Sequence, residues 1–257
     1  MESIWSEIFN LVFRWVHVIA GILWIGHLWY FNFVNAQVAK TYDDESRKKV
    51  VPELMPRALY WFRFGALYTW ITGFLLLGIV YYEGGALVYS EQSLMAARIW
   101  SIVAMVVGWG IYDQVWKRLA KKEVAGTLVS FILLAGMTYF LSTIMSGRGV
   151  FIHLGAVFGT IMLCNVWMRI WPNSRKLIAA TKGGTPAPEG AAAMASLRSK
   201  HNTYMSIPLI FFMVSNHFPT VYGSEYGWLI ALGFVALGWL GAKRLYVISG
   251  NPSTAKF

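Results

Sequence analysis

This sequence contains one cysteine and few charged residues. Cys164 is the only cysteine, so no disulfide can form within the chain. No C-x-x-C-H motif occurs, which excludes covalent attachment of a c-type haem to this chain. Charged residues make up 13% of the 257 residues, about half of the share in a typical soluble domain. So little charge argues against a soluble fold.

Apolar residues make up 57% of the chain and gather in stretches long enough to cross a bilayer core of about 30 Å. The alternating strands of an outer-membrane barrel are absent from the pattern. We therefore predict an all-α, polytopic integral membrane bundle, with residues 1–257 forming a single transmembrane domain. The seven predicted spans are residues 8–34, 58–82, 96–116, 126–145, 151–171, 204–218 and 226–245.

Basic residues occur in alternate loops. Most of the Lys and Arg residues lie in 35–57, 117–125 and 172–203, whereas 83–95 and 219–225 contain none. The positive-inside rule then predicts an N-terminus outside and a C-terminus in the cytoplasm. The formal net charge of +10 is mostly this topology signal, which faces anionic lipid, so no nucleic-acid partner is expected.

One connection has the composition of a loop. Residues 181–195 (TKGGTPAPEGAAAMA) combine glycine, proline and small residues between the fifth and sixth predicted spans. We predict a flexible cytoplasmic linker there.

The five histidines sort by predicted depth into two layers. His17, His153 and His217 fall near the outer face, and His27 and His201 fall near the inner face. Neutral imidazoles from different helices at one depth are what a b-type haem needs as axial ligands. The layers therefore predict one or two haem b groups, with His17, His153, His27 and His201 as candidate iron ligands. The alternative for each histidine is a hydrogen-bonded packing role.

Two other polar residues in the spans also have two interpretations. Arg14 either extends its guanidinium to the outer surface or pairs with a haem propionate or an anionic substrate. Asn165 lies at the edge of a polar stripe on the fifth span. That stripe serves either a substrate or proton path, or hydrogen bonds between helices.

Three long segments resemble one known family. RWVHVIAGILWIG (14–26), GRGVFIHLGAVFGTIMLCNVWMRIWPNSRK (147–176) and LRSKHNTYMSIPLIFFMVSNHFP (197–219) are similar to the membrane domain of the bacterial cytochrome c-linked urate hydroxylases. The resemblance implies a location in the bacterial inner membrane, oxidation of urate to 5-hydroxyisourate and transfer of electrons to a c-type cytochrome. The positions that match the family's motifs are His17, His153, His201, Asn216 and His217. Candidate substrate contacts are Arg148, Asn165 and Asn216.

Members of that family continue into a C-terminal cytochrome c domain, whereas this sequence ends at Phe257. We therefore expect a separate c-type cytochrome as the electron partner. The favoured hypothesis is a redox membrane protein that binds haem b. The second is a urate hydroxylase that uses a cytochrome c from another gene. The third is a cofactor-free transporter or assembly subunit whose histidines line a proton or anion path.

Overall fold

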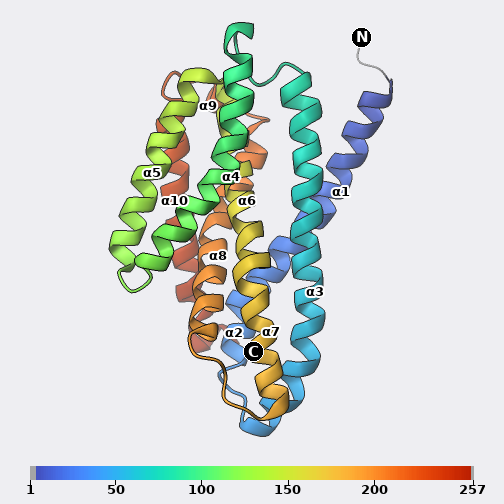
Figure 1. Ribbon diagram of the computed structural model, residues 1–257, viewed down its shortest axis with the longest axis vertical. Helices are drawn as coiled ribbons and strands as arrows, with labels where there is room; N and C mark the ends of the chain where they lie inside the picture. The colour runs from blue at the N-terminus through green and yellow to red at the C-terminus, as the bar shows by residue number, and fades with distance from the viewer. Residues whose placement is uncertain (1–3, 256–257) are drawn as a thin grey trace. The chain divides into compact units, whose positions relative to one another are not determined.

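The computed structural model describes residues 4–255, and every regular element in that range is helical (Figure 1). This confirms the predicted all-α class. The α-helices are α1 (Ile4–Trp29), α2 (Ala36–Val38), α3 (Asp44–Leu76), α4 (Leu94–Arg118), α5 (Glu123–Ile144), α6 (Gly147–Asn165), α7 (Trp171–Gly183), α8 (Ala191–Ser215), α9 (Pro219–Tyr222) and α10 (Gly227–Ser249). Three segments are π-helical, η1 (Tyr30–Asn35), η2 (Leu77–Glu83) and η4 (Val166–Ile170), and two are 3-10 turns, η3 (Glu91–Ser93) and η5 (Pro252–Ala255).

Six helical segments in the described residues are long and apolar enough to cross a membrane. They are Ile4–Val38, Asp44–Glu83, Glu91–Arg118, Glu123–Ile144, Gly147–Gly183 and Gly227–Ser249. Four of the seven predicted spans lie within them, and 126–145 and 226–245 each extend one residue beyond, which is consistent with a multi-pass membrane protein. The other, 204–218, overlaps α8, a helix that also carries Arg198, Lys200 and His201. The count of seven spans and the orientation of the termini stay predictions.

Large apolar side chains are exposed on several of these segments. Trp15, Ile22, Val106, Ile132 and Leu240 each keep more than half of their surface accessible. Such exposure would be costly in water but is expected where hydrocarbon covers the surface. The segment Gly147–Gly183 behaves differently, because 78% of its most apolar stretch is buried inside the protein.

The chain forms two compact units, each made of three segments. Unit 1 comprises Met1–Trp15, Ile71–Ile161 and Pro208–Gly238, and unit 2 comprises Val16–Trp70, Met162–Ile207 and Trp239–Phe257. All five boundaries between segments fall inside helices, namely α1, α3, α6, α8 and α10. The units are therefore groupings of packed helix segments within the predicted transmembrane domain, and neither is a separate stretch of sequence.

In unit 1, α6 packs closely on α8 at Gly155. A Cβ atom at Gly155 would lie 2.8 Å from the Met213 methyl and 3.2 Å from the Phe212 Cβ, so a larger residue would force the helices apart. The Phe212 ring packs edge-on against Phe151, with ring centroids 5.7 Å apart. Glycine and other small residues commonly allow such close packing between membrane helices.

In unit 2, side-chain amides and hydroxyls connect neighbouring helices. The Asn165 Nδ2 atom donates to Asn202 Oδ1 at 2.9 Å, and the Asn202 Nδ2 atom donates to the Met162 carbonyl at 2.9 Å. Trp29 Nε1 donates to the Ser206 hydroxyl at 2.9 Å. These bonds satisfy polar groups where no bulk water is present, and they hold α1 and α6 against α8.

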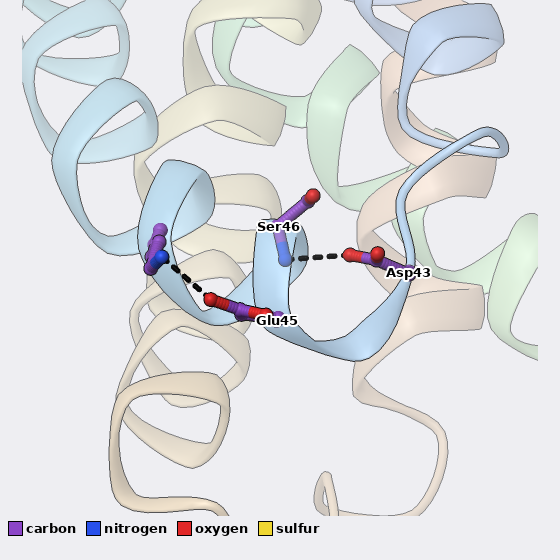
Figure 2. Close-up of polar contacts among 4 residues, drawn as sticks. Asp43, Glu45 and Ser46 are labelled. Atoms are coloured by element: carbon purple, nitrogen blue, oxygen red, sulfur yellow. Dashed lines mark hydrogen bonds and ion pairs between the residues drawn. The ribbon is translucent and has the colours of Figure 1, made fainter.

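The start of α3 is fixed by an N-terminal cap. Asp43 Oδ1 accepts a hydrogen bond of 2.7 Å from the Ser46 backbone N–H, beside an exposed ion pair of 2.6 Å between Glu45 and Lys49 (Figure 2). Hydrogen bonds from the Ser46 backbone, and then from its side chain, lower the pKa of Asp43 from its ordinary value. The capping carboxylate is thus held in its charged form.

The predicted linker is shorter than expected. Residues 181–183 end α7, Gly184 takes a left-handed conformation with φ 64°, and α8 already begins at Ala191. Alanine has the highest helix propensity of all residues, so the alanines after Gly190 extend α8 instead of the loop. The non-helical connection is therefore limited to residues 184–190, and its flexibility stays a prediction.

Candidate functional site

Unit 1 contains two adjoining polar groups of side chains. We call the first the Arg148 cluster (Arg148, Asn216 and Tyr81) and the second the His153 relay (His153, Tyr82 and Ser101). The two meet because Tyr81 and Tyr82 are consecutive, and because the rings of Tyr81 and His153 lie edge to face with centroids 6.2 Å apart.

Local structure explains where the Arg148 cluster forms. Arg148 is the second residue of α6, whose first turn is capped by the Ser146 hydroxyl accepting from the Gly149 N–H at 2.9 Å. Asn216 follows the last residue of α8, and its Nδ2 atom donates to the Phe212 carbonyl at 3.3 Å. Tyr81 lies in the π-helical segment η2. Single π turns in helices are frequent at functional sites.

Asn216 holds the guanidinium of Arg148 from one side. The Asn216 Oδ1 atom accepts from the Tyr81 hydroxyl at 2.5 Å and from Arg148 Nε at 3.3 Å. The guanidinium also lies over the Tyr81 ring, 5.6 Å from its centroid, which is a cation–π geometry. Arg148 is half-buried, and among the residues that the structure describes it forms no ion pair with a carboxylate.

The hydrogen bonds of His153 define its tautomer. Its Nδ1 atom lies 2.7 Å from the Gly149 carbonyl oxygen, which can only accept, so Nδ1 carries the proton. In the neutral ring Nε2 is then an acceptor, and the Tyr82 hydroxyl donates to it at 3.2 Å. The Ser101 hydroxyl donates to the Arg98 carbonyl at 2.8 Å, and its oxygen lies 2.9 Å from the Tyr82 oxygen. His153 and Ser101 are both fully buried, so this is an internal path that ends on a proton acceptor.

A cavity of about 320 Å³ also lies in unit 1, next to the start of α6. Gly147, Phe151, Tyr222 and Trp228 are among its lining residues. Glu225 is the one charged residue in that lining, and Arg148 is not part of it. The cavity therefore suits a neutral or apolar ligand better than an anion.

Two other residues predicted near the outer face, His217 and Arg14, are exposed. His217 lies on the surface in the turn after α8. Arg14 is exposed on α1, where its Nε atom donates to Asn10 Oδ1 at 2.5 Å. Arg14 belongs to unit 1 and lies close enough to Tyr81 to interact with it electrostatically. A second positive charge thus lies near the Arg148 cluster.

The remaining predicted residues lie in unit 2. His17 and His201 are half-buried, and His27 Nδ1 bonds to the Leu23 carbonyl at 2.7 Å within α1. Asn165 is fully buried and bonded to Asn202, so its observed role is to connect α6 with α8. Of the three candidate substrate contacts, the structure brings together Arg148 and Asn216.

Of the predicted haem ligands, His27 has a nitrogen atom available for the iron, whereas His153 does not. His27 keeps its Nε2 atom for a metal, because the carbonyl bond at Nδ1 fixes the tautomer that haem ligation requires. His153 does not fit in this arrangement, since its Nε2 atom is bonded to Tyr82 and the ring is fully buried. In the described residues, no group of three or more His, Cys, Asp or Glu side chains could hold a metal ion.

Sequence reasoning missed Tyr81, Tyr82 and Ser101. The two tyrosines end the predicted span 58–82, where aromatic residues normally mark the membrane interface. The consecutive Tyr-Tyr-Glu at 81–83 carries no distinguishing signal, and Ser101 looks like any small residue in a membrane helix.

Six helical segments in the described residues are long and apolar enough to cross a membrane, and each of the two units contains buried polar side chains. These features are consistent with a multi-pass membrane protein. The chain belongs to the urate oxidase N-terminal family, whose model matches residues 3–50 and 42–254. Comparisons with curated proteins and with solved structures gave no significant match.

Proposed function

We propose that this protein oxidises urate to 5-hydroxyisourate in the bacterial inner membrane and passes the electrons to a separate c-type cytochrome. The family match over nearly the whole chain is the observation that carries this proposal. In the reaction urate gains the oxygen of one water at C5 and releases two protons and two electrons. Each oxidised cytochrome takes one electron, so two are reduced for each urate.

The chemistry of unit 1 supports the same proposal. The reaction needs a contact for an anionic substrate and a group that takes up a proton. Arg148 supplies a positive charge that no described carboxylate neutralises, and His153 supplies a neutral imidazole whose Nε2 atom accepts from Tyr82. Through Tyr82 the relay can receive a proton without exposing His153 to water.

Haem b is part of the proposal for unit 2. His27 and His201 are the residues that would hold its iron. A haem bound there would supply one-electron transfer. His153 is not part of this haem proposal, because its Nε2 atom is bonded to Tyr82.

The test combines the purified full chain in detergent, urate and an oxidised soluble c-type cytochrome. We expect urate-dependent reduction of the cytochrome, with two reduced for each urate consumed and with oxygen from labelled water in the product. Absence of both signals in folded protein, with a cytochrome shown to be reducible by ascorbate, would overturn the proposed oxidation.

A visible spectrum of the same sample tests the haem. We expect the dithionite-reduced protein to give the sharp α-band of a low-spin bis-histidine haem b, and His27→Ala to remove or broaden it. A colourless protein, expressed with ample haem and still folded, would overturn the haem proposal. If it were also inactive on urate, the transporter or assembly hypothesis would be favoured.

A further inference from the structure

The Arg148 guanidinium has two hydrogen-bonding edges, and Asn216 contacts the one that carries Nε. Nε bonds to Asn216 Oδ1 at 3.3 Å, and the Tyr81 ring lies against a face of the group at 5.6 Å. The pair of terminal nitrogens forms the other edge, a rigid fork that matches two acceptor atoms in one plane. An arginine held in this way is already oriented for a bidentate partner.

The charge balance around this fork is incomplete. All four ion pairs in the described residues involve other cations. Arg14 adds a second positive charge within electrostatic range of Tyr81. A half-buried cation without an ion pair and with a like charge nearby favours an anionic ligand, because an anion would offset the cost of its partial desolvation.

We infer that the Arg148 cluster binds a planar heterocyclic monoanion through the terminal nitrogens of Arg148, with Asn216 and Tyr81 as positioning residues. This rests on the proposed function, which makes urate the ligand, since urate carries one negative charge at neutral pH. A ring nitrogen and an adjacent carbonyl oxygen of deprotonated urate present two acceptors in one plane. That geometry complements the fork, whereas a neutral purine offers no charge to it.

Asn216 has a specific part in this binding. Its Oδ1 atom is shared between the Tyr81 hydroxyl and Arg148 Nε, so the amide sets the direction of the fork without neutralising its charge. A carboxylate at the same position would form an internal ion pair with Arg148. Asn216→Asp hardly changes the size of the side chain. Its carboxylate would pair with Arg148 and so compete with the bound urate anion.

The experiment measures binding of urate to the full chain in detergent by equilibrium dialysis, with xanthine as the largely neutral comparison. We expect Arg148→Gln to weaken urate binding about 10- to 100-fold, the usual range for loss of a charge-assisted bond. Arg148→Lys should be intermediate, because it keeps the charge but loses the fork. Asn216→Asp should weaken urate binding at least as much as Asn216→Ala while thermal stability is maintained.

Arg118→Gln is the matched control. Arg118 is an exposed arginine at the C-terminal end of α4 in the same unit, and its removal should leave urate affinity unchanged. Equal affinity for urate in Arg148→Gln and the unsubstituted chain, or equal affinity for urate and xanthine, would overturn the inference. If Arg148→Gln still bound urate with unchanged affinity and the protein oxidised urate, the binding site would be wrong and the proposed function would stand. If urate binding depended on Arg148 but no oxidation occurred, the binding site would stand and the proposed function would be wrong.

Discussion

Arg148 in unit 1 and Arg63 in unit 2 are two half-buried arginines that the protein accommodates in opposite ways. Neither forms an ion pair with a carboxylate of the described residues. Hydrogen bonds hold Arg148 through Asn216, whereas aromatic rings surround Arg63. The Arg63 guanidinium lies 4.0 Å from the ring centroid of Trp171, with other rings between 5.2 and 5.8 Å away, those of Tyr60, Phe64 and Trp167.

These two environments give the arginines different roles. Amide contact at Nε fixes the direction of the Arg148 fork and leaves its outer edge for a ligand. Ring faces compensate the charge of Arg63 without directing it, and its buried Nε atom has no hydrogen-bond partner. We therefore interpret Arg148 as a binding residue and Arg63 as a structural residue that anchors α3 against α7.

The largest expected effect separates these roles by enzyme kinetics. Arg148→Gln should lower kcat/KM for urate about 10- to 100-fold, mainly through KM, because a ground-state contact is lost. Arg63→Gln should leave the KM for urate unchanged. Steady-state kinetics with urate and a c-type cytochrome measure both. A raised KM in Arg63→Gln of the same size would break the distinction between the two arginines.

The next effect concerns stability and the buried, hydrogen-bonded ring of His153. His153→Leu removes the hydrogen bonds of the ring to the Tyr82 hydroxyl and to the Gly149 carbonyl, so it should cost about 0.5–1.5 kcal/mol of stability for each bond lost. Thermal unfolding in detergent measures the loss. Tyr82→Phe is the milder companion, since it removes one hydroxyl and keeps the ring beside His153, 5.8 Å away. Unchanged stability in both variants would mean that the relay is not formed.

Removal of the aromatic contacts of Arg63 comes next in size. Arg63→Met keeps much of the side-chain volume but loses the cation–π attraction, which amounts to about 0.5–2 kcal/mol. The melting temperature should fall, and Arg63→Lys should recover part of the loss. If Arg63→Met were fully stable but no longer bound urate, the roles assigned to the two arginines would have to be exchanged.

The smallest effect concerns an exposed hydrogen bond, at the cap of α3. Asp43→Ala removes the acceptor for the Ser46 N–H, so the melting temperature should fall slightly. The pKa of Asp43 is lowered in the folded protein, so its stabilisation is complete above the ordinary value of 3.8 and disappears as the pH falls through the lower folded value. The melting curves of the variant and the unsubstituted chain should differ at neutral pH and converge at low pH.

Apolar length predicted the membrane-length helices, because hydrocarbon thickness constrains sequence directly. It could not predict the site, because depth alone does not say which atoms a side chain contacts. His153 and His27 look alike in sequence, and both bond through Nδ1 to the carbonyl four residues earlier. They differ at Nε2, where His153 meets Tyr82, a residue from a different helix. Arg148 and Asn216 were identified, but Tyr81, which joins them, was not, since interfacial tyrosines are common.

The π-helical segment η2 has a consequence for how this protein tolerates insertions and deletions. A π turn contains one residue more than an α-helical turn, and η2 carries both Tyr81 and Tyr82. Deleting a single residue between Leu77 and Val80 would restore an ordinary helix but shift the following side chains by about 100° around the axis. Tyr81 would turn from Asn216 and Tyr82 from His153 at once. The length of this segment is therefore under a stricter constraint than its composition, and homologues with gaps here should lack both tyrosine contacts.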